Sequence, residues 1–132
     1  LAVAKAGALA AKAEAVGEFQ LLVERLDGVD GAGLQGAAQS LADQLGDGAA
    51  VVIGGLPNPA DLGKVILVAA FGKQVIAAKL QAGKFIGAIA KLCGGGGGGR
   101  PNLAQAGGRD GAQLTSALEA AAVQLQQALE NA

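Results

Sequence analysis

The sequence predicts a small α/β domain, with a mixed sheet of short strands flanked by helices. Short β-branched apolar runs alternate with stretches in which apolar residues recur every three or four positions, which is typical of strands alternating with amphipathic helices. The chain has 132 residues, of which 52% are hydrophobic. That is enough for one domain with a core of its own.

The N-terminal stretch is expected to be helical. Leu9, Val16 and Val23 repeat every seven residues, Phe19 and Leu26 form a second series, and no proline interrupts residues 1–27. This pattern predicts either an amphipathic helix packed on its own domain or the truncated end of a longer dimerising helix. Glycines follow from residue 28, so we expect a helical segment over 1–32 and a globular domain over 33–132. Because the chain starts at Leu1 and contains no Met, we expect a fragment of a longer protein.

The remaining elements follow in order along the chain. Residues 34–45 have helical spacing, and residues 50–53 form a β-branched strand that ends at two glycines. Residues 64–71 are apolar on both faces, which predicts a central strand. We expect a helix over 85–92, an extended segment over 103–106, and a closing helix to Leu129 that begins at an Asp110 and Gln113 capping box.

The residue inventory excludes several kinds of chemistry. The chain has no His and one Cys, so it has no Ser-His-Asp or Cys-His arrangement, no imidazole metal site and no internal disulfide. Cys93 has no base to activate it and is predicted to be a buried small hydrophobe. We expect no catalytic residue, no metal and no cofactor in this segment. No uncharged apolar run approaches the length of a membrane span, and we expect a cytoplasmic parent protein.

Charge is divided unevenly along the chain, although the total is only −1. Residues 1–61 hold three basic and eight acidic residues, whereas residues 62–109 hold seven basic residues and no acidic one. Lys84 and Lys91 are seven positions apart and therefore share one face of the predicted helix. A stretch of this kind predicts either a surface that meets phosphate or a solvated helix face.

The glycine run at residues 94–99 lies inside the basic stretch and ends at Arg100. Consecutive glycines allow backbone N–H groups to converge on an anion and let another backbone approach closely. Arg100 adds a forked donor suited to phosphate. The run lacks the pattern of a P-loop or a dinucleotide-binding turn. A flexible linker is the alternative, but the apolar segments on both sides favour a folded loop.

The glycine run and the Arg-Pro-Asn-Leu-Ala-Gln-Ala-Gly-Gly segment after it resemble the C-terminal domain of alanyl-tRNA synthetases, which is of the DHHA1 type. The resemblance runs from about Leu34 to the end of the chain. Related DHHA1 domains of DHH-family phosphoesterases usually carry a His after the glycines. Arg100 stands there in this chain and favours the synthetase branch.

The resemblance implies a domain without a catalytic centre, in a parent enzyme whose ATP-dependent alanine activation and zinc-dependent editing lie upstream. It implies binding of tRNA, here tRNA-Ala, at the outer corner of the L-shape, and a preceding helix that forms a homodimer. Together with the charge pattern it predicts these RNA-binding residues: Lys73, Lys79, Lys84, Lys91, Gly94, Gly95, Gly96, Gly97, Gly98, Gly99, Arg100, Asn102, Gln105 and Arg109. For Asn102 and Gln105, satisfying backbone groups of the loop is an equal alternative.

Two alternative functions remain open from the sequence. One is the substrate-binding half of a DHH phosphoesterase without its catalytic metal domain. The other is an oligomerisation module, in which the basic stretch has no RNA-binding role.

Overall fold

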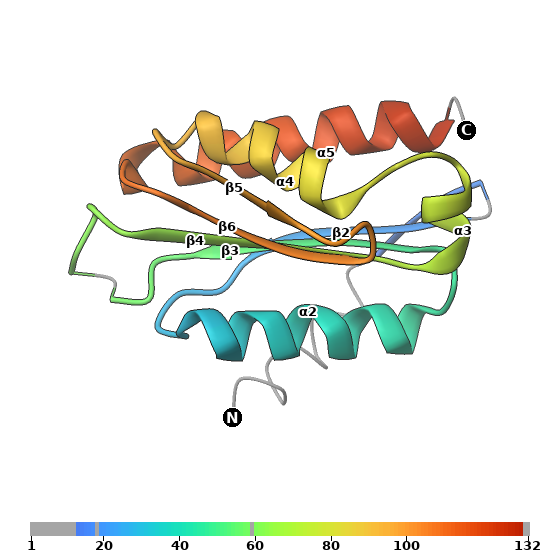
Figure 1. Cartoon of the computed structure of the whole chain (residues 1–132), viewed down its shortest axis with the longest axis horizontal. Helices are drawn as coiled ribbons and strands as arrows, with labels where there is room; N and C mark the ends of the chain where they lie inside the picture. Colours follow the sequence, from blue (N-terminus) through green and yellow to red (C-terminus); the bar gives the residue numbers. More distant parts are fainter. Residues whose placement is uncertain (1–12, 18, 59, 131–132) are drawn as a thin grey trace.

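In the computed structural model, which describes residues 13–17, 19–58 and 60–130, the chain forms one six-stranded sheet with helices on both faces (Figure 1). The strands lie in the order β1-β2-β3-β4-β6-β5. Their bounds are β1 (Glu14–Val16), β2 (Phe19–Arg25), β3 (Ala49–Gly55), β4 (Val65–Phe71), β5 (Gly96–Gly99) and β6 (Leu103–Gly108). The helices are α2 (Gly31–Leu45), α3 (Lys73–Ala77), α4 (Ala82–Lys91), the 3-10 helix η2 (Gly111–Gln113) and α5 (Leu114–Glu130).

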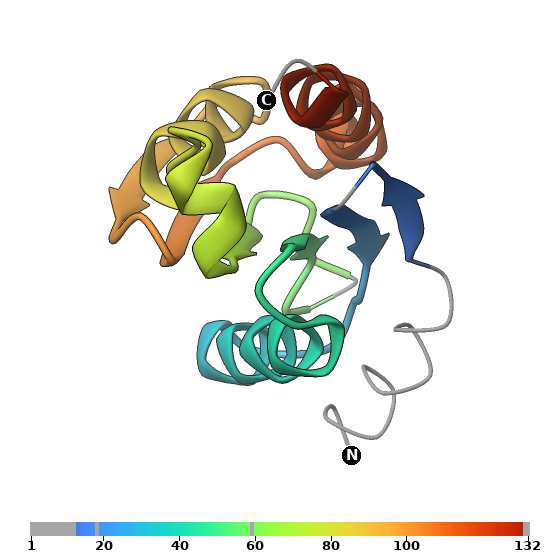
Figure 2. The same ribbon diagram turned by 90° about the vertical axis from the view of Figure 1, so that its right-hand side faces the viewer.

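The helices form two layers around the sheet, as the end-on view in Figure 2 shows. Helix α2 covers one face through Leu34, Ala37, Ala38 and Leu41, which are fully buried. Helices α4 and α5 cover the other face and form a second core with the alternate residues of the same strands. The predicted α/β class, with a small mixed sheet flanked by helices, is therefore confirmed.

The pairing of the strands explains why the sheet is mixed. Strands β2 and β3 are parallel and are connected through α2, whereas the other neighbouring strands are antiparallel. Both β3 and β4 are buried along their whole length, because each has a neighbour on both sides and helices above and below. Their continuous apolar runs agree with this position.

The helix predicted for the N-terminal stretch is wrong over the part that the structure describes. Residues 14–16 and 19–25 form β1 and β2, a hairpin that turns at Gly17 with a φ of +62°. The seven-residue repeat was misleading because successive residues of β2 enter opposite cores. Leu21 packs toward α5 and Leu22 toward α2, and Phe19 and Val23, which belong to the repeat, lie on the same side as Leu21. Because β2 pairs with β3, the sheet extends across the boundary expected at residue 32. Residues 1–12 lie outside the described part, and a dimerisation helix there stays a prediction.

The other predicted elements are confirmed as α2, β3, β4, α4, β6 and α5. Two details differ. The short helix α3 is an element that the sequence pattern did not predict. The predicted capping box is wrong, because the Asp110 side chain makes no cap hydrogen bond and η2 separates it from α5. The backbone N–H groups of Arg109 and Asp110 instead donate to the Cys93 carbonyl, which fixes this segment against the end of α4.

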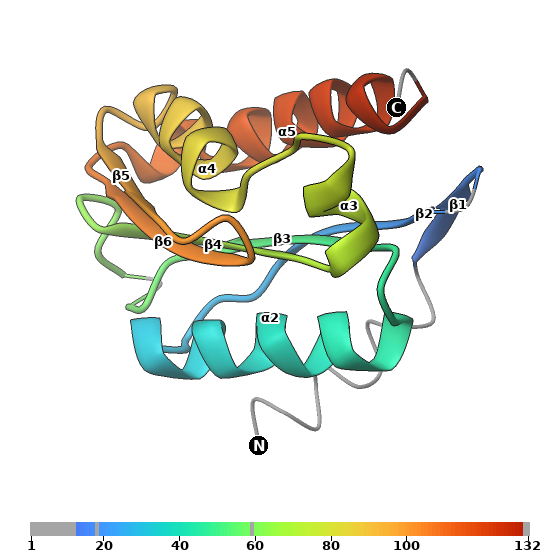
Figure 3. The same cartoon turned by 45° about the vertical axis from the view of Figure 1, so that its right-hand side comes forward.

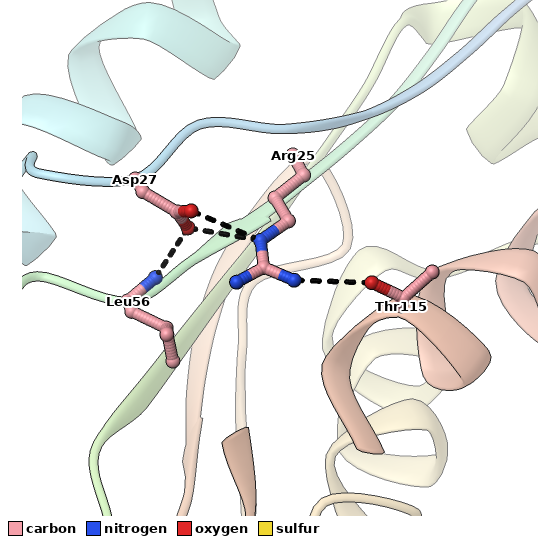
Figure 4. Close-up of polar contacts among 4 residues, drawn as sticks. All are labelled: Arg25, Asp27, Leu56 and Thr115. Carbon is pink, nitrogen blue, oxygen red and sulfur yellow. Dashed lines mark hydrogen bonds and ion pairs between the residues drawn. The ribbon is translucent and has the colours of Figure 1, made fainter. Parts of the chain in front are cut away.

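A small polar cluster joins the end of β2 to the rest of the fold (Figure 4). The Asp27 carboxylate accepts hydrogen bonds from the Leu56 N–H at 3.0 Å and from the Arg25 Nε, and Arg25 also donates to the Thr115 hydroxyl at the start of α5. Partial burial on its own raises the pKa of Asp27. The Leu56 N–H and the Arg25 guanidinium outweigh that effect, so the pKa lies below its ordinary value.

Candidate nucleic-acid interface

Residues 96–99 of the glycine run form an edge strand, β5, and not the folded loop predicted from the sequence. Strand β5 pairs antiparallel with β6, from Gly96 opposite Gly107 to Gly99 opposite Ala104. The hairpin closes at Pro101 and Asn102, where the Arg100 N–H donates to the Leu103 carbonyl at 3.1 Å. All four residues of β5 are exposed.

The backbone N–H groups of the run fall into three sets: those that bond to α4, those that face β6 and those that face away from β6. Gly94 has a φ of +71° and ends α4, and the N–H groups of Gly94 and Gly95 donate to the Lys91 and Ala90 carbonyls. In an antiparallel ladder, inward and outward residues alternate along each strand. Since Arg100 bonds to β6, Gly96 and Gly98 also face β6, while Gly97 and Gly99 face away from β6, on the side where α4 approaches the strand. Only these two glycines of the run present outward donors.

Helix α4 packs closely against β5, and both elements lie together in Figure 3. A Cβ atom at Gly83 would lie 2.6 Å from the Gly99 carbonyl oxygen, and one at Gly87 would lie 2.9 Å from the Gly97 carbonyl oxygen. Glycines on both elements therefore permit this approach. Gly83 and Gly87 were not among the residues predicted from the sequence, although their spacing of four positions places them on one helix face.

Between α4 and β5 lies an open groove of about 530 Å³. Its walls are the four glycines of β5 and one face of α4, from which Lys84 and Lys91 line the groove. Both lysines are exposed. Among the described residues the single ion pair joins Arg25 and Asp27, so neither lysine is neutralised by a carboxylate there. The structure thus brings together the two lysines and the glycine strand that the sequence analysis singled out.

Other predicted residues lie on the opposite, α2-facing side of the β5–β6 hairpin. Arg100 and Gln105 line one hollow there, together with Gly98 and Gly99. Gln105 and Arg109 line a second hollow, next to Gly95 and Gly96. All three side chains belong to exposed residues.

Three predicted residues lie apart from the hairpin's hollows. Lys73 and Asn102 line a separate hollow that also contains Asp43 and Asp47. The Asn102 carbonyl accepts a hydrogen bond from the Phe71 N–H, which ties the hairpin turn to β4. Lys79 follows α3 with a φ of +70°, the only positive φ of a non-glycine residue in the described part of the chain.

The described residues carry no constellation for catalysis. Cys93 is buried; burial raises the pKa of its thiol, and the charge of Asp110 raises it further, which disfavours the reactive thiolate. Phe71 and Phe85 belong to the core or pack against it, with ring centroids 6.0 Å apart. No group of three or more potential metal-ligating side chains occurs within the ranges that the structure describes.

The fold and the surface define a three-layer α/β domain with an exposed glycine strand at the sheet edge and basic side chains around it. The chain belongs to the DHHA1 domain family, whose model matches residues 18–127.

Two curated relatives are highly similar to this chain. An alanine–tRNA ligase of Synechococcus sp. (strain WH7803) is 84% identical over 129 residues, which are 98% of this chain. One of Parasynechococcus marenigrum (strain WH8102) is 89% identical over 117 residues, or 89% of this chain. The chain spans only 14% and 13% of the length of these two relatives.

Solved structures show the same fold. The C-Ala domain of Aquifex aeolicus alanyl-tRNA synthetase superposes with a TM-score of 0.70 at 28% identity, covering 89% of this chain and 97% of that one. A DHH-domain member of the s1p family of ribosomal proteins, PF0399, superposes with a TM-score of 0.63 at 15% identity, covering 95% of this chain and 30% of its own. The second likeness concerns the fold alone. Within the described residues, no helix is long and apolar enough to cross a membrane.

Proposed function

We propose that this domain binds tRNA as the C-terminal part of a longer alanine–tRNA ligase. The observation that carries the proposal is the groove in which Lys84 and Lys91 face a strand without side chains. The relatives named alanine–tRNA ligase and the C-Ala domain of similar fold support it. Alanine activation and editing take place in other domains of the parent, in the cytoplasm, and this domain holds the tRNA at its outer corner.

The groove binds RNA through its sugar–phosphate backbone. Lys84 and Lys91 neutralise phosphates, and the absence of side chains on β5 lets the RNA backbone approach the strand. The outward N–H groups of Gly97 and Gly99 are donors for phosphate oxygens. Arg100, at the end of the same strand, supplies a further charge-assisted contact. Phe71 and Phe85 are packed into or against the core, so binding relies on charge and shape more than on base stacking.

The test is a titration of the domain with a transcribed tRNA-Ala and with an acceptor minihelix that lacks the outer corner, each at two salt concentrations. We expect tighter binding of the complete tRNA and a loss of affinity at high salt. Lys84→Gln, Lys91→Gln and Arg100→Gln should each weaken binding. The comparison variant is Lys73→Gln, which removes the same charge from the hollow that contains Asp43 and Asp47.

Each result has a defined meaning. Equal affinity for the two RNAs would contradict binding at the outer corner. Affinity that does not change with salt concentration would contradict binding through contacts between lysines and RNA phosphates. If Lys73→Gln weakens binding as much as Lys91→Gln, overall charge rather than the groove determines affinity.

A further inference from the structure

The α2-facing side of the β5–β6 hairpin carries a second basic hollow, of about 720 Å³. Lys64 and Arg109 both line it, at the end of the ladder where Val65 pairs with Gly108, and Gln105 and glycine backbone complete the lining. No acidic residue lines this hollow. Lys64 belongs to the basic stretch, but the sequence analysis did not single it out, because its position just before β4 gives no sign that it meets Arg109.

This hollow and the groove beside α4 lie on opposite sides of one backbone. Gly96 lines both of them, and β5 has no side chains that would widen the wall between them. The smaller hollow at Arg100 shares Gly98 and Gly99 with the groove and Gln105 with the larger hollow. Basic side chains therefore follow one another around the free edge of β5.

We propose that Lys64 and Arg109 form a second phosphate-binding site for the same RNA that occupies the groove. The RNA backbone lies along Lys84 and Lys91 and crosses β5 at Gly96, which lines both hollows, onto this site. The inference rests on the proposed RNA binding and extends it to a further site. A ligand with a single phosphate fills one hollow only, whereas a nucleic acid presents phosphates at regular intervals and spans both.

The side chains of the site are available for a ligand. Lys64 and Arg109 are exposed, and no side-chain hydrogen bond or ion pair joins either to another residue within the described ranges. The Arg109 backbone is fixed by its N–H bond to the Cys93 carbonyl at 2.8 Å, so the hollow keeps its wall when the side chain is shortened. Substitution of both residues should therefore leave the fold intact, which a thermal melt of the variant would verify.

The experiment measures the affinity for transcribed tRNA-Ala over a series of salt concentrations, using the domain with Lys64→Gln and Arg109→Gln combined. A side chain that contacts phosphate contributes about 1 to the slope of log affinity against log salt concentration. We expect the slope to become less steep by about 2 in the double variant. The charge-matched comparison combines Lys73→Gln and Lys79→Gln. The sequence predicted both lysines to bind RNA, but they lie at the start of α3 and just after it, and neither lines the groove or the two hollows of the hairpin, so the slope should change less.

Two failures can be told apart. If the unchanged domain does not bind RNA, or if Lys84→Gln with Lys91→Gln leaves binding intact, the proposed function is wrong. If that groove variant loses affinity while the Lys64 and Arg109 variant keeps the original slope, only the second site is wrong. A slope change equal to that of the comparison variant would also overturn the second site.

Discussion

Replacing Gly87 with alanine should destabilise the domain, whereas the same replacement at Gly36 should stabilise it. Each glycine is the sixth residue of its helix, in α4 and α2 respectively. A Cβ at Gly36 would have no atom within 4 Å. A Cβ at Gly87 would lie 2.9 Å from the carbonyl oxygen of Gly97, a backbone atom of the neighbouring strand. The pair therefore separates helix propensity from the close contact between α4 and β5.

The magnitudes follow from these two contributions. Alanine in a helix interior is more favourable than glycine by about 0.8–1.0 kcal/mol, which Gly36→Ala should gain in full. Overpacking a close contact costs about 1–3 kcal/mol, so Gly87→Ala should range from nearly neutral to about 2 kcal/mol less stable. The difference between the two variants should be about 1–3 kcal/mol. For a domain of this size it corresponds to about 4 °C in Tm per kcal/mol.

Urea unfolding followed by far-ultraviolet circular dichroism measures both changes, because the chain has no Trp or Tyr to report by fluorescence. Equal stabilisation by the two substitutions would refute the close contact of α4 with β5. The RNA affinity of Gly87→Ala is a second readout. Displacement of β5 changes the groove, so affinity should fall more than in Gly36→Ala.

Three further predictions concern other parts of the fold. Lys79→Gly should raise the free energy of unfolding by about 1 kcal/mol in a thermal melt, because glycine adopts a φ of +70° without the strain of a side chain, and Lys79→Ala should give no such gain. The pKa of Asp27 is lowered in the folded state, so its contribution to stability is present above the unfolded pKa and is lost as pH falls through the folded pKa. Asp27→Asn should therefore reduce the loss of stability on acidification, as urea titrations at several pH values would show, and an unchanged acid profile would contradict the hydrogen bonds to Asp27. The Cys93 thiol should react slowly with a disulfide reagent in the native domain and rapidly in urea, since it is buried and its pKa is raised; fast native reaction would mean that the end of α4 is open.

Much of the fold could be predicted because the hydrophobic pattern of each segment agrees with its burial in the structure. The β-branched runs of β3 and β4 are buried on both faces, and the apolar stripes of α2 and α5 face the sheet. The N-terminal stretch shows where local pattern is insufficient. Phe19 and Val23 fit a helix stripe as well as one face of a strand, and only pairing with β3, 29 residues further along the chain, decides between them.

For the candidate site, the sequence predicted which residues take part better than it predicted where they lie in the fold. Charge counting and helical spacing identified Lys84 and Lys91, and composition identified the glycine run. That the glycines form a strand beside α4 depends on pairing with β6, since glycine itself has a low strand propensity. The meeting of Lys64 and Arg109 depends on β4 lying next to β6, which no local signal indicates.

A strand made only of glycine has an energetic consequence for the sheet edge. Glycine loses more conformational entropy on ordering than any other residue, and β5 contributes no apolar side chain to offset that loss. Its order depends on the ladder to β6 and on the closeness of α4, so we expect this edge to open at a lower cost than the buried strands β3 and β4. Amide hydrogens of Gly96 and Gly98 then exchange with solvent through small openings of the edge, well below the free energy of global unfolding. A polyanion bound along the strand would restrict those openings and protect the amides. Binding at this edge should therefore slow the hydrogen exchange of these glycines.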